Sequence, residues 1–398
     1  MKRVLSVILV AIVMSTFVFA EDVKVGLITI LSGNYSFYGE TTMNGMILAI
    51  DEANAAGGVN GEQIKLIIED NGAKPDESVA IAKKLINVNN VSAILGPIFS
   101  SNCLAVGPIA QESKVPMLTA TGTNDKVTDA GDYVSRICFT DSSQGSVMAT
   151  FAQQDLSAKN AVVLIDSGSD YSKGLASSFV KTFTDNGGNV IEEISYVASD
   201  TDFSSVLIKV KSKKPDVIFV PGYGEVALIV KQARELKIES TFLGGDGWDS
   251  SEILKIAGES INGSFITSHF SAEDQAPKVQ NFLKAYNEKF GKAPSVLSAL
   301  GYDAGNILVE AIKTAGSSDR EAIKKAIAST AGFDGVTGSI TLDEKRNPKN
   351  KTATILEAKG GKYVFSTTVE PGSIKKMKEE PKEEKKGIFY KLFKGFKK

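Results

Sequence analysis

The chain has 398 residues, a net charge of −2 and 42% hydrophobic residues. The first 20 residues contribute +2 and residues 374–398 contribute +6, so residues 21–373 carry −10. An acidic body without a basic and aromatic face argues against nucleic acid as a partner. About 350 residues lie between the two ends, more than one hydrophobic core usually holds, so we expect two lobes.

The first 20 residues have the pattern of an export signal. Lys2 and Arg3 give a positively charged start. An apolar centre follows at Val4–Val13, and Val18–Ala20 forms an end with small residues. No cysteine follows Ala20 to carry a lipid, and no later segment reaches about 18 uninterrupted apolar residues. We therefore predict a signal peptide at residues 1–20 and a mature protein in the periplasm or cell envelope.

From Val23 onward, short apolar runs alternate with helical patterns. The runs are Val23–Ile30, Ile64–Glu69, Ala93–Leu95, Met117–Thr119, Ala161–Ile165, Val190–Tyr196, Val217–Val220, Phe242–Leu243 and Phe265–Phe270. Their length and β-branched content are typical of strands buried on both faces. Apolar residues at helical spacing lie between them, as in Tyr38–Ala55. This alternation predicts parallel sheets wrapped by helices, which bind ligands at the carboxyl ends of their strands.

The alternation breaks near residues 139–144 and again near residues 268–276. Later helical patterns cover Val279–Phe290, Ala299–Ala315 and Arg320–Ala328, and strand-like pieces cover Gly338–Leu342 and Ala353–Ala358. Two sheets, with a chain that crosses between them more than once, account for this layout. We predict lobe 1 as residues 22–141 plus 271–344 and lobe 2 as residues 142–270 plus 345–370.

Residues 371–398 form a charged linker followed by a basic amphipathic tail. Within residues 387–398, one helical face would carry Ile388, Phe389, Leu392, Phe393 and Phe396, with lysines around it. Such a pattern is typical of a helix that lies on an anionic membrane surface. A frayed tail, or one packed weakly on the body, is the alternative, and the sequence leaves both open.

Polar turn residues follow two of the expected strands, at Gly96–Asn102 and at Thr121–Asn124. Ser100 and Ser101 stand where a helix N-cap stands, ahead of an apolar-periodic segment. A helix start exposes free N–H groups and a partial positive charge, so this corner suits a small carboxylate. The alternative is that Ser100 merely caps its own helix.

The sequence offers little material for catalysis. His269 is the only histidine, and we interpret it as structural. Asp166 and Asp170 read as loop acids rather than as a general acid and base. No nucleophile elbow, H-E-x-x-H or phosphate-loop motif occurs. We predict no enzyme, no cofactor and no metal.

Two cysteines, Cys103 and Cys138, lie in a chain that we expect to be exported, where a disulfide can form. Both fall in apolar surroundings. Two buried free thiols are the expectation, and a disulfide is the alternative.

Motifs spread over residues 22–365 match one known family. They are Val25-Gly26 through Ser32-Gly33, Tyr38-Gly39, Gly57-Gly58-Val59-Asn60-Gly61, Gly96–Ser101, Pro116–Thr123, Asp141–Gly145 and Asp343-Glu344-Lys345. Together they resemble the bacterial leucine/isoleucine/valine-binding proteins, which are type I periplasmic solute-binding proteins of ABC transporters. The resemblance implies an α/β fold of two lobes, each with a mostly parallel sheet wrapped by helices. Three crossovers would join the lobes, which close on a ligand like a hinged trap.

The resemblance also implies ligand-binding residues in the first lobe. Ser100 would donate its hydroxyl to the ligand carboxylate, and Thr123 matches a family threonine. Thr121 replaces an alanine that acts through its backbone, so its hydroxyl is an additional candidate contact.

In the second lobe, Asp246 takes the place of a family glutamate that pairs with the ligand ammonium. Tyr223 matches a second-lobe tyrosine, and Tyr171 and Tyr38 match aromatic positions that line the cleft. Trp248, two residues after Asp246, is a candidate wall of the site, with packing inside the lobe as the alternative.

Three positions depart from the family pattern. Ala73 and Phe99 stand near the places of a family disulfide, and Leu297 replaces a phenylalanine that lines the side-chain slot. The pocket of this chain can therefore differ in shape.

The physics of a free amino acid fits these residues. Its two opposite charges need hydrogen-bond donors for one and an anion for the other, while apolar and aromatic walls select the side chain. We predict a monomeric solute-binding protein that captures a branched-chain or other aliphatic amino acid. It would deliver this ligand to an ABC permease with ATPase subunits. An amide, urea or aromatic acid as ligand, a sensor role, and an amide hydrolase of the envelope are the alternatives.

Overall fold

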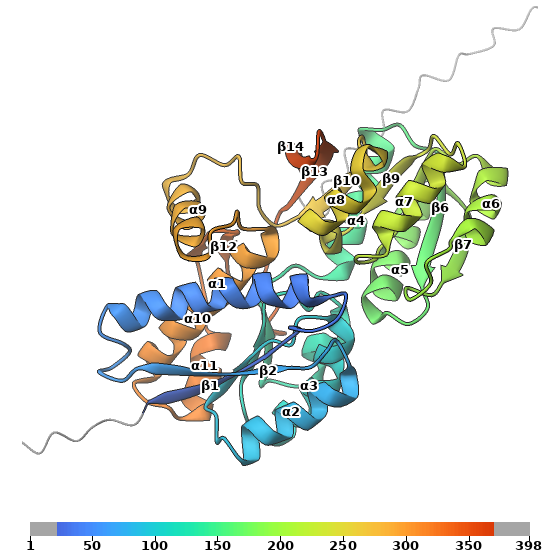
Figure 1. The fold of residues 1–398 in the computed structure, drawn as a ribbon. Coiled ribbons are helices and arrows are strands. Elements are labelled where there is room, and N and C mark those ends of the chain that lie inside the picture. Colours follow the sequence, from blue (N-terminus) through green and yellow to red (C-terminus); the bar gives the residue numbers. More distant parts are fainter. Residues whose placement is uncertain (1–21, 370–398) are drawn as a thin grey trace, which may run out of the picture.

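The computed structural model describes residues 22–369 and has two lobes, each built around its own sheet (Figure 1). The expected signal peptide and the charged tail lie outside the described residues. Within residues 22–369, no helix has both the length and the apolar character that a membrane span requires. The expected fold class, two α/β lobes with mostly parallel sheets, is confirmed.

Lobe 1 contains a five-stranded parallel sheet with the order β2-β1-β3-β4-β5. Its strands are β1 (Val23–Thr29), β2 (Ile64–Asp70), β3 (Ala93–Leu95), β4 (Met117–Thr119) and β5 (Val134–Arg136). Its helices are α1 (Ser36–Ala55), α2 (Pro75–Asn87), α3 (Ser100–Glu112), η1 (Asp125–Ala130), α9 (Pro277–Phe290), α10 (Val296–Ala315) and α11 (Arg320–Ala328). A small antiparallel pair, β11 (Phe333–Gly335) and β12 (Gly338–Ile340), completes the lobe.

Lobe 2 contains a seven-stranded sheet with the order β14-β13-β10-β9-β8-β6-β7. Its strands are β6 (Asn160–Asp166), β7 (Asn189–Tyr196), β8 (Val217–Phe219), β9 (Thr241–Gly244), β10 (Phe265–Ser268), β13 (Ala353–Lys359) and β14 (Lys362–Val369). Its helices are α4 (Asp141–Gln154), α5 (Asp170–Asp185), α6 (Ser204–Lys213), α7 (Val226–Glu235), η2 (Asp246–Trp248), α8 (Ser251–Ala257) and η3 (Gly258–Ile261). Only β13 and β14 run antiparallel to their neighbours.

The chain passes between the lobes three times. The first crossover joins β5 to α4, the second joins β10 to α9, and the third joins β12 to β13. Every apolar run expected from the sequence forms a strand, although the expected burial on both faces is wrong for β2 and β7, which lie at the edges of their sheets and are only partly buried. The residues at which we place each lobe boundary stay a prediction.

Both cysteines are buried in lobe 1 and its first crossover, and both are free thiols, as expected. The Sγ atom of Cys103 donates to the carbonyl oxygen of Pro97 at 3.2 Å. Burial raises the pKa of the Cys103 thiol to about 12, so this cysteine is an inert part of the core.

Candidate functional site

The first-lobe side of the site is formed by the loops that leave β3 and β4. The expectation that Ser100 and Ser101 occupy the cap position of α3 is wrong by one residue. Phe99 is the N-cap, with extended backbone angles and no side-chain cap, and Ser100 begins the helix. Ser100 is buried, and its Oγ accepts the backbone N–H of Asn124 at 3.2 Å. Ser100 therefore joins the two loops instead of capping its own helix.

The two threonines of the second loop have different surroundings. The hydroxyl of Thr121 donates to the carbonyl oxygen of Ile98 at 2.7 Å, so it holds the loop before α3. The hydroxyl of Thr123 is buried and forms no hydrogen bond of ordinary geometry with a described residue, although it is close enough to the Asp141 carboxyl to lower the pKa of that group. An unpaired buried hydroxyl is unfavourable, which makes Thr123 a candidate contact for a ligand.

On the second-lobe side, Asp246 begins the short helix η2, directly after β9. Its side chain is buried, with 4% of the residue exposed. The hydroxyl of Tyr171 donates to Asp246 Oδ1 at 2.9 Å, and the Asp246 N–H donates to Gln144 Oε1 at 3.0 Å. Gln144 Oε1 also accepts the hydroxyl of Thr267 at 2.6 Å. These neutral groups hold the acid in one place.

The contact between Tyr171 and Asp246 requires a glycine beside it. A Cβ atom added at Gly245 would lie 2.3 Å from the Tyr171 hydroxyl oxygen, closer than two such atoms can approach. Any side chain at position 245 would therefore push Tyr171 away from Asp246.

Aromatic side chains from both lobes meet between these two loops. Tyr223 of lobe 2 stacks on Phe99 of lobe 1 with 4.1 Å between the ring centroids, and on Tyr171 at 4.9 Å. Tyr38 packs edge-on against Tyr223 at 5.3 Å, and its hydroxyl donates to the carbonyl oxygen of Gly247 at 2.8 Å. The three tyrosines expected at the site are therefore brought together, with Phe99 added to them.

Two further hydrogen bonds connect the lobes nearby. The side-chain amide of Asn124 donates to the carbonyl oxygen of Asp170 at 2.8 Å. The N–H of Asp170 in turn donates to Ser101 Oγ at 3.2 Å. Together with the Tyr38 contact, these bonds hold the loops of lobe 1 against the start of α5.

Trp248 lies apart from this group. It is fully buried in the core of lobe 2, and its indole N–H donates to the carbonyl oxygen of Val220 at 2.8 Å. Trp248 therefore packs inside the lobe, which was the alternative to a role as a wall of the site. Its ring is not part of the aromatic group around Tyr223.

Sequence reasoning assigned no ligand role to Asp141 and Gln144, which also belong to the site. Neither carboxylate oxygen of Asp141 nor Nε2 of Gln144 forms a hydrogen bond of ordinary geometry with a described residue, and Thr123 is the hydroxyl that interacts with the Asp141 carboxyl. Burial raises the pKa of the Asp141 carboxyl well above its usual range, and the nearby Asp246 raises it further. The motif Asp141–Gly145 could have indicated these two residues, because it places Asp141 and Gln144 in the first turn of α4, directly after the first crossover.

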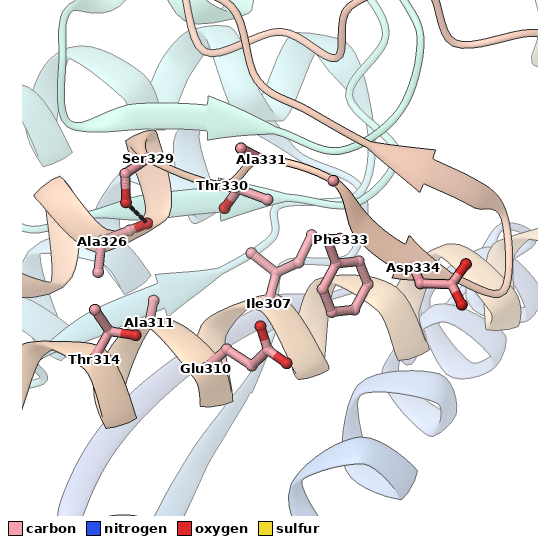
Figure 2. A pocket seen from close by; sticks show the side chains of 11 residues that line it. Ile307, Glu310, Ala311, Thr314, Ala326, Ser329, Thr330, Ala331, Phe333 and Asp334 are labelled. Carbon is pink, nitrogen blue, oxygen red and sulfur yellow. Dashed lines mark hydrogen bonds between the residues drawn. The ribbon is translucent and has the colours of Figure 1, made fainter.

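The described residues contain no cluster of three or more histidine, cysteine and acidic side chains that would hold a metal. They do contain a surface pocket on lobe 1, lined by α10, α11 and β11 (Figure 2). Glu310, Ser329 and Phe333 are among its lining residues. None of the residues predicted to bind a ligand lines this pocket.

Comparison with known proteins places this geometry in a family. A profile of the periplasmic binding protein family matches residues 22–362. A leucine-, isoleucine-, valine-, threonine- and alanine-binding protein from Pseudomonas aeruginosa is 30% identical over 340 residues, which cover 85% of this chain and 90% of that protein.

Two solved structures share the fold closely. A leucine-binding protein from Thermotoga maritima is 38% identical, with a TM-score of 0.84, over 88% of this chain and 99% of that chain. A branched-chain amino-acid transporter binding protein from Streptococcus pneumoniae, solved with isoleucine, is 35% identical, with a TM-score of 0.83, over 88% of this chain and 100% of that chain. The chain therefore belongs to the periplasmic binding proteins, in the branched-chain amino-acid binding family.

Proposed function

We propose that this protein captures a free aliphatic amino acid between its lobes and delivers it to an ABC permease with ATPase subunits. One observation carries the proposal. Asp246 is a buried acid, yet the described residues place no lysine or arginine in an ion pair with it. A buried charge without a counter-charge is strongly unfavourable, so the ammonium group of a ligand is its natural partner.

The opposite side of the cleft suits the other charge of an amino acid. Ser100 lies at the start of α3, where free N–H groups and the helix dipole favour a carboxylate. Thr123, whose buried hydroxyl forms no hydrogen bond of ordinary geometry, lies on the next loop. A zwitterion placed between these hydroxyls and Asp246 would meet a complementary group at each end.

The contacts between the lobes support a closing mechanism. The Tyr38–Gly247 and Asn124–Asp170 hydrogen bonds exist only while the lobes touch. We infer that this arrangement is the closed form, and that a ligand that contacts both lobes shifts the population toward it.

An aromatic acid is a second candidate ligand. The stack of Phe99, Tyr223 and Tyr171 could hold a ring between the lobes. Such a ligand would supply a carboxylate but no ammonium, so it would leave Asp246 without a counter-charge. We therefore rank it second.

We also propose a cellular location and a membrane contact, which rest on the sequences of residues 1–20 and 387–398. Residues 1–20 would direct a monomeric protein to the periplasm or cell envelope, and residues 387–398 would contact an anionic membrane surface. Fusion of residues 371–398 to a soluble carrier, followed by a vesicle-binding assay, tests the second statement. Failure to bind anionic vesicles would refute it.

A ligand screen on refolded protein tests the function, because refolding removes any ligand carried through purification. The twenty amino acids, a set of amides and urea, and a set of aromatic acids would be compared by thermal shift, and each hit would be titrated by calorimetry. We expect the aliphatic amino acids to give the largest shifts, and the bound ligand to be recovered unchanged. A shift only with aromatic acids or amides, or turnover of the ligand, would refute the proposal.

A further inference from the structure

We propose that His269 is a positioning residue, which holds Asp246 in its binding orientation and leaves the negative charge of Asp246 available to a ligand. The inference rests on the proposed function, because it assigns Asp246 to the ligand ammonium. It assigns a role in the binding site to a residue that the sequence pattern suggested was merely structural.

The first argument is the geometry around the Asp246 carboxylate. Tyr171 donates to Oδ1 at 2.9 Å. His269 Nε2 lies 3.5 Å from Oδ2, on the other oxygen. The carboxylate is thus flanked by one side chain at each oxygen.

The second argument is that His269 itself is fixed. Its ring stacks on Phe139, with 3.4 Å between the centroids and 17° between the planes. Phe139 lies on the first crossover and His269 on the second. Because the lobes must rotate about these crossovers, the stack connects the acid of the site to the hinge.

The third argument is that both nitrogens of His269 are buried and lack a hydrogen-bond partner among the described residues at ordinary distance. A neutral imidazole carries one proton, and a proton on Nε2 would point to Asp246 Oδ2. A buried donor held near an acceptor in this way is suited to position it.

The charges around His269 keep it neutral. Burial is the main reason that the pKa of His269 is lowered to about 4; Asp246 opposes this effect, and the Lys351 ammonium on the third crossover acts in the same direction as burial. The other titratable groups whose charges interact with Asp246 are Tyr171, Tyr223, Cys138, Asp141 and Asp249. Burial raises the pKa values of all five, so the two tyrosines and Cys138 are neutral at pH 7.

The sign of the pH effect follows. Above its pKa the imidazole is neutral and places no positive charge beside Asp246. Below that pH the imidazolium would pair with Asp246 and compete with the ligand ammonium. Affinity should therefore be level near neutral pH and fall as the pH approaches about 4, where His269 gains its proton.

A single histidine makes the test direct, because the full chain labelled with 15N-histidine gives one imidazole spin system in NMR. We expect no protonation of His269 between pH 8 and about pH 5, and a change in its signals when the ligand is added. Asp246→Asn should lower the His269 pKa further, since it removes the charge that favours the proton. A His269 signal that titrates near 6.5 and ignores both changes would overturn the inference.

Three variants, checked for cooperative melting, complete the test by calorimetry. His269→Gln keeps an amide donor at the Nε2 position and should retain affinity within about threefold, as expected when the hydrogen bond is preserved. His269→Ala should weaken binding about tenfold, and His269→Lys about a hundredfold or more, because it adds a cation beside Asp246. Equal affinity in wild type, His269→Ala and His269→Lys would overturn the inference.

Failure of the proposed function would look different. In that case the wild type would bind no amino acid at all. The response of the His269 pKa to Asp246→Asn would still show whether the two side chains act as a pair.

Discussion

The two sides of the cleft differ in the charge that they present to a ligand and in the number of side chains that hold their binding groups in place. Lobe 1 presents neutral hydroxyls at the start of α3 and on the neighbouring loop, and Ser100 needs only the backbone of Asn124 to hold it. Lobe 2 presents a buried acid, and Tyr171, Gln144 and a nearby histidine surround that single carboxylate.

The difference follows from electrostatics. The first N–H groups of a helix have no hydrogen-bond partner within the helix, so they can donate to a carboxylate without breaking another bond. An acid for an ammonium must be taken out of water and kept there. It therefore needs neutral hydrogen-bond donors that stabilise the charge without cancelling it. Substitutions on the two sides should reflect this asymmetry.

The largest effect should follow from removal of the acid. Asp246→Ala should weaken amino-acid binding by about 3 kcal/mol, because the ligand ammonium would then be buried without a partner. Calorimetry measures the change. Asp200→Ala, at an exposed acid of the same lobe, is the matched control and should leave affinity unchanged. Similar affinity in both variants would mean that Asp246 does not meet the ligand.

A smaller loss should follow on the other side. Ser100→Ala should weaken binding by about 2 kcal/mol, since the ligand carboxylate loses a donor and the Asn124 N–H loses its acceptor. Ser329→Ala, on the surface pocket of Figure 2, provides the control. If Ser100→Ala proved more damaging than Asp246→Ala, the asymmetry between the two sides would be reversed.

A side chain at position 245 tests the hydrogen bond between Tyr171 and Asp246, while Asp246 itself stays in place. Gly245→Ala should weaken binding by roughly 1.5 kcal/mol, because its Cβ atom would displace the Tyr171 hydroxyl from Asp246. Gly224→Ala is the control, since a Cβ atom there meets no atom within 4 Å. Unchanged binding in Gly245→Ala would show that Asp246 functions without Tyr171.

The smallest effect should come from the contact between the two sides. Tyr38→Phe removes the hydrogen bond to Gly247 but keeps the ring. We expect affinity to fall by about 1 kcal/mol, mainly through faster release, because only the closed form loses a bond. Stopped-flow measurement of the dissociation rate checks this. An unchanged rate would show that the bond contributes nothing to closure.

The fold was largely predictable from the sequence, because buried parallel strands leave a strong pattern. The runs at Ala93–Leu95 and Val217–Phe219 are fully buried and apolar enough to identify without a structure. Three strands escaped prediction for physical reasons. β5 (Val134–Arg136) and β11 (Phe333–Gly335) are only three residues long, and β14 (Lys362–Val369) is a partly exposed edge strand with little apolar pattern.

The site was predictable where a local motif marks it. Ser100 and Thr123 follow their strands directly, and a helix start is visible in the sequence. Asp141 and Gln144 escaped, because their burial arises only when the first crossover brings α4 beside β10 and the Asp246 loop. Trp248 shows the reverse case, in which a residue close to the site in sequence points into the core instead.

The most direct test compares two ligands that differ by one charge. L-leucine and 4-methylpentanoate share a side chain and a carboxylate, but only leucine has an ammonium group for Asp246. Calorimetric titration of the refolded protein should show 4-methylpentanoate binding at least about a hundredfold more weakly than leucine. Equal affinity for the two would contradict the account, because the buried acid of lobe 2 would then play no part in recognition.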